Sequence, residues 1–244
     1  MHIIKLDATT STNTYLKESL VGQHVENFTV VVAKTQSQGR GQRGSQWISE
    51  SGKNLTFSFL CEFGTLDASH FFWINAYVSV ALWRSLRDYK IPDLAIKWPN
   101  DIMSGSKKIA GILIENSLTG HLINHSIVGI GLNVNQSGFM GVPNAASLKM
   151  VTGKEYDLNE LLIHIMVTME SDLGKLSLLQ ETIWETYESH LFGKNIPGTF
   201  VDAFENTFQG TIGGVTKDGR LSIQKQDGTQ VFFRPKEVKM VFGE

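Results

Sequence analysis

The order of apolar and polar positions predicts a chain that begins with alternating strands and helices. Six short apolar runs have the length and composition of strands: 2–6, 28–33, 55–60, 94–98, 107–115 and 122–134. The segment 70–89 is apolar on nearly all sides, which predicts a helix buried against a sheet. Strands that alternate with helices in this way indicate an α/β or α+β fold.

A second helix is predicted over 157–176, where apolar residues recur on one stripe. Asp157 and Glu160 have the spacing of a capping box at its start. Gly174 is expected to weaken or break this helix, and a further helical segment is expected to run to about residue 190. These helices support the core and carry no chemistry.

The period changes to two after a linker at 193–198 that contains glycine and proline. Short strands are expected at 200–208, 210–215, 220–224, 230–233 and 238–242. The pairs Asp218-Gly219 and Asp227-Gly228 are hairpin signals. We therefore expect a small β-barrel at 194–244 and a larger catalytic domain at 1–193.

Composition and charge exclude several classes of protein. The 244 residues carry a formal net charge of −2, which argues against general nucleic-acid binding. Cys61 is the only cysteine, and it is expected to be packed and not reactive. The N-terminus has no signal pattern, and the most apolar segment, 71–86, is too short and too polar to span a bilayer. A cytoplasmic protein without membrane association is expected.

The segment 36–47 has neither a helical nor a strand period and holds the densest candidate chemistry. Gly39, Gly41 and Gly44 allow the backbone to approach a ligand closely. Arg40 and Arg43 offer planar guanidinium groups suited to phosphate or carboxylate. One interpretation is a loop that closes over an anionic ligand and is ordered only when that ligand is bound. The alternative is a flexible surface loop whose arginines keep it soluble.

The segment 9–14 is rich in short hydroxyl and amide side chains. Its simplest interpretation is a helix N-terminus at which Ser, Thr or Asn caps free N–H groups. One cap residue suffices for that purpose. The surplus of donors and acceptors also suits a small polar ligand group, such as an amide or a ureido ring.

Two further stretches place polar residues at strand ends. Asn100 and Asp101 follow the strand before Pro99, where α/β sheets commonly bind ligands, although a plain Asn-Asp turn is the alternative. Lys108 stands near Gly111 and is suited to a phosphate or carboxyl oxygen, although single lysines at strand starts are commonly solvated.

Gly129 and Gly131 interrupt a buried strand, which indicates that something flat packs against it. The third glycine and the following helix of a dinucleotide fingerprint are missing. The seven histidines show no metal-ligand spacing, so no metal site from side chains is expected.

Taken in order, these motifs resemble the biotin protein ligase family, also called biotin–[acetyl-CoA-carboxylase] ligase. The matching stretches are 11–13, 36–47, 97–101, 108–115 and 129–133, and the C-terminal strands resemble that family's SH3-like domain. The resemblance covers essentially the whole chain. It implies a class II aminoacyl-tRNA synthetase-like mixed sheet with helices, followed by an SH3-like β-barrel.

The resemblance also implies an activity. Biotin would react with Mg-ATP to give biotinyl-5′-AMP and pyrophosphate, and biotin would then pass to one lysine of a biotin carboxyl carrier protein. Mg²⁺ would be carried by ATP. A monomer and a homodimer are both compatible with this sequence.

The resemblance assigns roles to individual residues. Biotin would be bound by Ser11, Thr12, Asn13, Gln36, Gly39, Arg40, Gly41, Gln42, Lys108, Gly111 and Gly129. ATP and the adenylate would be bound by Arg40, Arg43, Trp47, Asn100, Lys108 and Asn133. Arg40, Lys108 and Asp101 would be catalytic.

Two departures from the family pattern matter. Many members have a basic residue where Gln42 stands, and often another where Ser45 stands, so faster leakage of the adenylate is expected. Some bacterial relatives begin with a helix-turn-helix domain that represses transcription. The motif begins here at Ser11, which leaves no room for such a domain, so sequence-specific DNA binding is not expected.

Three alternatives stand beside this interpretation. A lipoate or octanoate ligase or transferase has the same catalytic fold, but the Gly-Arg-Gly loop with 97–101 favours biotin. A non-catalytic biotin-binding protein would not need both Arg40 and Lys108. An RNA-binding module would need a basic surface interleaved with aromatic residues, which the sequence lacks.

Overall fold

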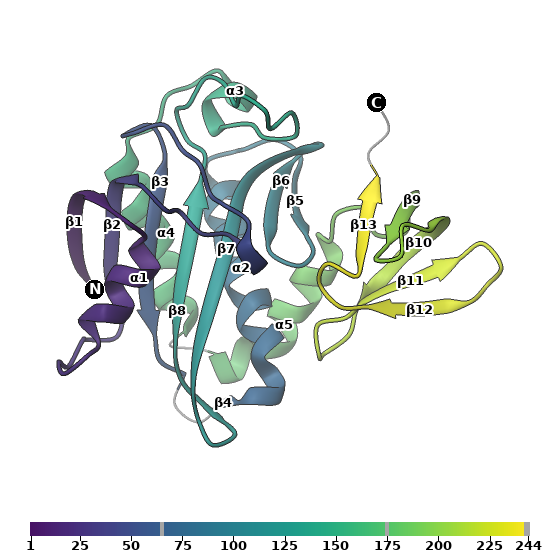
Figure 1. The fold of residues 1–244 in the computed structure, drawn as a ribbon, viewed down its shortest axis with the longest axis horizontal. Helices are drawn as coiled ribbons and strands as arrows, with labels where there is room; N and C mark the ends of the chain where they lie inside the picture. The colour runs from purple at the N-terminus through teal and green to yellow at the C-terminus, as the bar shows by residue number, and fades with distance from the viewer. Residues whose placement is uncertain (64–65, 174–175, 242–244) are drawn as a thin grey trace.

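The computed structural model describes residues 1–63, 66–173 and 176–241. A broad sheet forms the larger part of the molecule, and a smaller sheet lies beside it (Figure 1). The strands of the broad sheet are β1 (His2–Thr9), β2 (Thr29–Gln36), β3 (Leu55–Cys61), β4 (Leu66–Asp67), β5 (Leu94–Lys97), β6 (Asp101–Ser104), β7 (Lys107–Thr119) and β8 (Leu122–Leu132). Their order is β1-β2-β3-β8-β7-β6-β5, and β4 pairs with β8.

The broad sheet is mixed, as predicted. β1 pairs with β2 in parallel, and the other neighbouring strands are antiparallel. β2 continues to Gln36, beyond the predicted end at residue 33. This extension carries the Gln36 side chain to the same end of the sheet as the start of the first helix.

The helices cover the two faces of this sheet unequally. The described helices are α1 (Thr12–Ser19), α2 (Phe71–Asp88), α3 (Leu148–Thr152), α4 (Leu158–Leu173) and α5 (Leu176–Ser189), with short 3₁₀ turns η1 (Gln42–Gly44) and η2 (Ala68–His70). Figure 1 shows α1 in front of the sheet and α2, α4 and α5 behind it. Leu16 of α1 packs in a small core with Val31, Leu60 and Ile127. The main core lies on the opposite side, around α2.

The two long predicted helices are confirmed. α2 is buried at most of its positions, as its all-round apolar character predicted. At the start of α4, Asp157 Oδ1 accepts hydrogen bonds from the N–H groups of Asn159 and Glu160, which is the N-terminal half of the predicted capping box. Gly174 lies outside the described residues.

The smaller sheet consists of β9 (Pro197–Asp202), β10 (Thr207–Val215), β11 (Leu221–Lys225), β12 (Gln230–Phe233) and β13 (Val238–Val241), in the order β12-β11-β10-β9-β13. Both predicted hairpin turns are confirmed, because Gly219 and Gly228 have positive φ between paired strands. The single strand predicted at 200–208 is wrong. The chain turns after Asp202, whose carboxylate accepts hydrogen bonds from the N–H groups of Phe204 and Asn206.

Specific contacts join the smaller sheet to the rest of the chain. The indole Nε1 of Trp98 donates to the carbonyl of Gly219 (3.0 Å). Glu188 Oε1 accepts from the N–H of Val215 (2.6 Å). A Cβ atom at Gly219 would lie 2.5 Å from the ring of Phe72, so the turn packs directly on α2. These contacts hold the smaller sheet against the end of the broad sheet at which the candidate site lies.

The fold bears on the predictions for Cys61 and for membrane-spanning segments. Cys61 is buried in the main core, which confirms a packed residue, and burial raises the pKa of its thiol, as expected for an unreactive one. Across the described ranges, the helices are each too short or too polar to cross a bilayer.

Candidate active site

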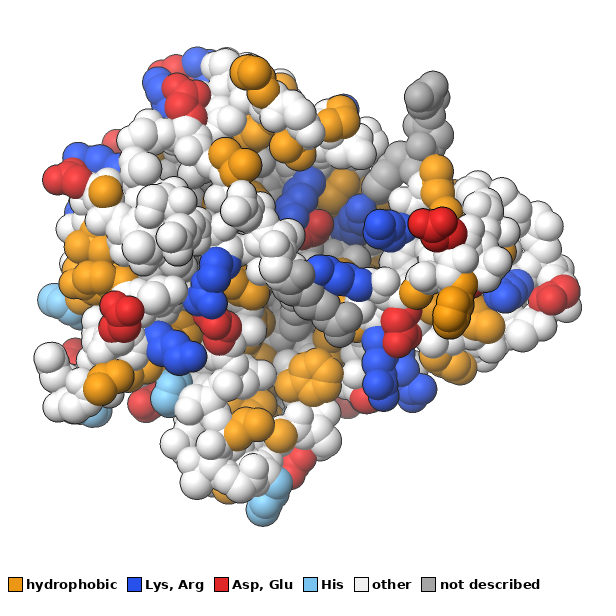
Figure 2. All heavy atoms as spheres, viewed as in Figure 1, with side chains coloured by type: hydrophobic (Ala, Val, Ile, Leu, Met, Phe, Trp, Pro, Cys, Tyr) orange, Lys and Arg blue, Asp and Glu red, His pale blue; other side chains and the backbone are white. Residues whose placement is uncertain are grey.

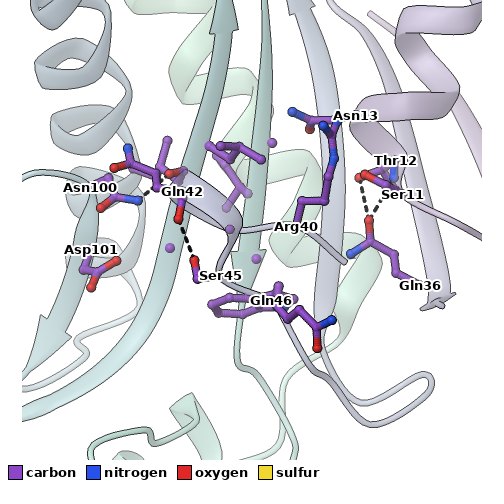
Figure 3. Close-up of a pocket in the computed structure, with 18 of the residues that line it drawn as sticks. Ser11, Thr12, Asn13, Gln36, Arg40, Gln42, Ser45, Gln46, Asn100 and Asp101 are labelled. Carbon is purple, nitrogen blue, oxygen red and sulfur yellow. Dashed lines mark hydrogen bonds between the residues drawn. The ribbon is translucent and has the colours of Figure 1, made fainter. Parts of the chain in front are cut away.

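An open cavity of about 250 Å³ lies on the front face of the broad sheet, against the smaller sheet (Figure 3). Its walls hold thirteen of the sixteen predicted site residues: Ser11, Thr12, Asn13, Gln36, Arg40, Gly41, Gln42, Trp47, Asn100, Asp101, Lys108, Gly111 and Gly129. Segments far apart in the sequence therefore meet in one place, as the order of the motifs predicted.

A hydrogen-bonded row of polar side chains forms one end of the cavity. Gln36 Oε1 accepts from the backbone N–H of Thr12 (2.8 Å) and lies 3.2 Å from its hydroxyl. The Ser58 hydroxyl lies within hydrogen-bond distance of both Thr12 Oγ1 (2.6 Å) and Asn13 Oδ1 (2.5 Å). The prediction that a side chain of 9–14 caps this helix is wrong, because Ser11 makes no capping bond and Gln36 of β2 accepts from Thr12 instead. The surplus hydroxyl and amide groups are therefore used in the cavity wall.

Two glycines of β8 are explained by close contacts within the cavity. A Cβ atom at Gly129 would lie 2.2 Å from Asn13 Oδ1, and one at Gly131 would lie 2.2 Å from the indole ring of Trp47. Gly111 is the cross-strand partner of Gly131, and its Cβ position is 3.2 Å from both Trp47 and the ammonium of Lys108. The flat groups on these glycines are thus the amide of Asn13 and the indole of Trp47. The Nε1 of Trp47 is buried without a hydrogen-bond partner.

Each of the two predicted catalytic cations is paired with a carboxylate. Lys108 Nζ lies 2.7 Å from Asp101 Oδ1, and Arg40 Nη2 lies 2.9 Å from Glu115 Oε2. All four side chains keep some solvent exposure, between 19% and 44%. An anionic ligand in the cavity would therefore meet two cations whose charge is already partly balanced.

Lys97 adds a third basic group next to this pair. Burial lowers the pKa of Lys97; the charge of Asp101 opposes this shift, and the charge of Lys108 adds to it. Lys97 also lines a groove between the two sheets, together with Lys236 and Lys239. The groove shares Pro99, Asp101 and Lys236 with the cavity. Figure 2 shows Lys and Arg side chains on both sides of this junction.

The glycine-rich loop folds back on itself in front of the sheet. Gly41 N–H donates to the carbonyl of Ser45 (2.7 Å), and Trp47 N–H donates to the carbonyl of Gly39 (2.9 Å). A Cβ atom at Gly39 would lie 2.3 Å from the carbonyl oxygen of Trp47, so the loop itself requires this glycine. The expectation that the loop is ordered only with a ligand stays a prediction.

The comparisons with known proteins agree with this geometry. A sequence model of the "Biotin/lipoate A/B protein ligase family" matches residues 6–133. The chain belongs to this family. It is 27% identical over 241 residues to the bifunctional ligase/repressor BirA of Bacillus spizizenii, covering 95% of this chain and 72% of that protein. It is 35% identical over 122 residues to the biotin–[acetyl-CoA-carboxylase] ligase of Paracoccus denitrificans, covering 49% of this chain and 48% of that protein.

Solved structures support the same assignment. The biotin protein ligase of Aquifex aeolicus, in complex with biotin and ATP, superposes with a TM-score of 0.79 at 26% identity and covers 99% of each chain. The sequence resemblance to the biotin protein ligases is confirmed, and the chain is an enzyme of the biotin branch of this ligase family. The predicted mixed sheet with a C-terminal β domain is confirmed as well.

Two predicted site residues of this ligase, Gly39 and Asn133, do not line the cavity. Gly39 lies just outside it, at the base of the loop. Asn133 is buried, and its Nδ2 donates to the carbonyl of Ala146 (3.0 Å), which holds the segment before α3. The side chain of Arg43 lies outside the described part of the structure. The binding roles of these residues stay predictions.

The cavity of the ligase also contains residues that the sequence motifs did not indicate. Pro235 and Lys236 reach it from the turn between β12 and β13. Ser58 and Glu115 hydrogen-bond residues that line the cavity, from β3 and β7 respectively. Glu115 ends the matching stretch 108–115, but the resemblance gave it no role. The C-terminal residues had no sequence signal, because their sheet is brought to the cavity by packing alone.

Proposed function

We propose that this ligase activates biotin with ATP, forms biotinyl-5′-AMP and pyrophosphate, and transfers biotin to one lysine of a biotin carboxyl carrier protein. The observation that carries this proposal is the polarity of the cavity. Hydroxyl and amide groups of 11–13 and Gln36 line one end, and the cations Arg40 and Lys108 are among the other lining residues. Such a cavity suits a ligand with an uncharged polar ring and an anionic tail.

In the first step, an oxygen of the biotin carboxylate would attack the α-phosphorus of ATP. A bond from the carboxyl oxygen to phosphorus forms, and the bond to the β-phosphate breaks as pyrophosphate leaves. Two anions must approach each other, so Arg40 and Lys108 would offset the repulsion and stabilise charge on the phosphorus. The loop 36–47 would limit access of water to the reactive anhydride.

In the second step, the neutral amine of the acceptor lysine would attack the carbonyl carbon of the adenylate. An amide bond forms, AMP leaves, and the amine loses a proton. Asp101 would orient this lysine or accept the proton. This role is compatible with the position of Asp101 at the cavity wall, 2.7 Å from Lys108.

The remaining predicted site residues take roles in the same scheme. Ser11, Thr12, Asn13 and Gln36 would hold the ureido ring, and Gly111 and Gly129 would line the biotin slot. Trp47, Asn100 and Asn133 would shape the nucleotide end. Asn100 Nδ2 donates to the carbonyl of Ile112 (2.6 Å), which supports a positioning role between β6 and β7.

Mg²⁺ is assigned here to the ATP substrate. Within the described residues, His, Cys, Asp and Glu side chains form no group of three suited to a metal ion. Asp101 is the acidic residue that lines the cavity, and it is paired with Lys108. The phosphate oxygens of ATP would therefore provide the principal ligands of Mg²⁺.

Two wider assignments belong to the proposal. The division into a catalytic domain at 1–193 and a C-terminal domain at 194–244 is supported by the two separate sheets. A cytoplasmic location would bring the ligase to a carrier domain of a carboxylase.

Biotin-dependent exchange of labelled pyrophosphate into ATP tests the first step, with lipoate and octanoate measured in parallel. Exchange with biotin alone is expected, followed by labelling of a biotin-accepting carrier domain on a gel. Exchange with lipoate or octanoate would instead indicate that the ligase activates one of these acids. Biotin binding without exchange would leave a non-catalytic biotin-binding protein.

A further inference from the structure

Glu115 joins the polar end of the cavity to the glycine-rich loop. One oxygen of its carboxylate, Oε2, accepts from Nδ2 of Asn13 (2.7 Å) and from Nη2 of Arg40 (2.9 Å). Asn13 belongs to α1, Arg40 to the loop after β2, and Glu115 to β7. In Figure 3 the Arg40 side chain extends from the loop toward Asn13.

We propose that Glu115 is a positioning residue that couples biotin recognition by Asn13 to closure of the loop through Arg40. This inference rests on the proposed function, because it assigns Glu115 a part in the same site. Glu115 need not touch biotin for this role. It acts by fixing the orientation of one ligand-facing amide and the position of one ligand-facing cation.

The orientation of the Asn13 amide depends on a charged acceptor. An amide oxygen and nitrogen have almost the same shape, so hydrogen-bond partners alone decide which way the group faces. The carboxylate of Glu115 can only accept when ionised, which selects Nδ2 on its side. The Ser58 hydroxyl then meets Oδ1 on the other side (2.5 Å). Gly129 leaves the space in which the amide lies.

The position of Arg40 depends on the same oxygen. Arg40 is 44% exposed and stands on a loop, so its long side chain has many alternatives in solution. The ion pair with Glu115, which is only 29% exposed, holds the guanidinium beside β7. Charge-assisted bonds are stronger than neutral ones, so one carboxylate can hold both partners at once. Loss of the negative charge on Glu115 would release Arg40, and with it the loop, from β7.

The substitution Glu115→Gln tests this coupling with little change in shape. A neutral amide can accept from one partner but loses the attraction for Arg40. We expect biotin affinity, measured by calorimetry, to fall about fivefold, and the adenylate to dissociate about fivefold faster, as loss of a partly exposed ion pair predicts. Glu155→Gln is the matched control, because Glu155 forms an ion pair with Lys149 (2.6 Å) away from the cavity.

The same substitution made in an Arg40→Gln protein separates a positioning role of Glu115 from a general loss of stability. If Glu115 acts on adenylate release through Arg40, Glu115→Gln should change the dissociation rate in the wild type and not in an Arg40→Gln protein. Equal effects in both backgrounds would overturn the coupling. Unchanged biotin affinity in Glu115→Gln, with the same melting temperature as wild type, would overturn it as well.

Because biotin binding is measured without turnover, failure of this test can be distinguished from failure of the proposed function. Absence of pyrophosphate exchange in the wild type would remove the ligase reaction, whereas calorimetry would still report the effect of Glu115→Gln. Exchange in the wild type with no change in biotin affinity or adenylate release in the variant would retain the reaction and reject the role of Glu115.

Discussion

Lys108 and Asp101 face each other across the β6–β7 hairpin, with Nζ 2.7 Å from Oδ1. Asp101 pairs with Gly111, and Met103 pairs with Lys108, so Ile109 is an extra residue in β7. Without this bulge, Lys108 and Gly111 would point to opposite faces, because they are three residues apart. The bulge brings the ammonium to the face that Gly111 and Asp101 share.

Replacement of Lys108 by methionine should abolish most of the first half-reaction. The side chain would keep its length but lose the positive charge beside the reacting phosphate. We expect pyrophosphate exchange to fall by roughly 100-fold or more, as for other lost electrostatic contacts to a transition state. Lys107→Met is the control, because Lys107 is exposed and donates to the carbonyl of Pro143. Similar exchange rates in both variants would contradict the assignment.

Replacement of Gly129 by alanine should weaken biotin binding. The new Cβ would lie 2.2 Å from Asn13 Oδ1, so the amide must move and its contacts with Ser58 and Glu115 would be lost. The expected loss of affinity is about tenfold, measured by calorimetry. Gly213→Ala in β10 is the control, because its Cβ position is 3.6 Å from the nearest atom. An unchanged affinity would show that biotin binding does not depend on the position of the Asn13 amide.

The substitution Gln42→Arg should retain the adenylate longer. Gln42 lines the cavity at the start of η1, and a cation there would face the adenylate phosphate. We expect dissociation to slow by roughly three- to tenfold, measured with labelled adenylate. Gln38→Arg adds the same charge in the same loop outside the cavity wall. Equal dissociation rates for wild type and Gln42→Arg would remove the idea.

The stability of the protein should respond to pH through Lys97. Burial lowers the pKa of Lys97, so the folded state binds fewer protons than the unfolded state between that lowered pKa and about 10.4. The contribution of Lys97 to stability therefore rises with pH in this window, and below it the charged form is penalised in the folded state.

Lys97→Met should accordingly raise the melting temperature at pH 7, and this gain should shrink as the pH approaches about 10.4. Thermal unfolding at several pH values measures the difference, with Lys17→Met on the exposed side of α1 as control. A difference that does not change with pH would show that packing, and not charge, determines the effect.

Much of this ligase is predictable from its local sequence patterns. The helix α2 follows from a long run that is apolar on nearly all sides, and α4 follows from one apolar stripe with a period of about 3.6 residues. The hairpins at Gly219 and Gly228 follow from turn chemistry. The break after Asp202 was missed, because apolar residues recur on both sides of the turn, at 200–201, 203–204 and 208. The turn itself depends on the carboxylate of Asp202.

Part of the site is predictable from the sequence as well. Glycines in strands and a loop rich in glycine and arginine indicate close approach to an anionic ligand, because only glycine lacks a Cβ and arginine carries a fixed charge. The sequence alone thus determined the residue types of the cavity and their order along the chain.

Tertiary structure decided how these residues meet. The bulge at Ile109 sets the face of Lys108, and packing of the smaller sheet brings Lys236 to the cavity. Gln36 replaces a local cap at Thr12, and Glu115 joins Asn13 to Arg40 across 102 and 75 positions of sequence. Contacts at such separations leave no local pattern, because strand register and sheet packing bring the partners together only in the folded chain.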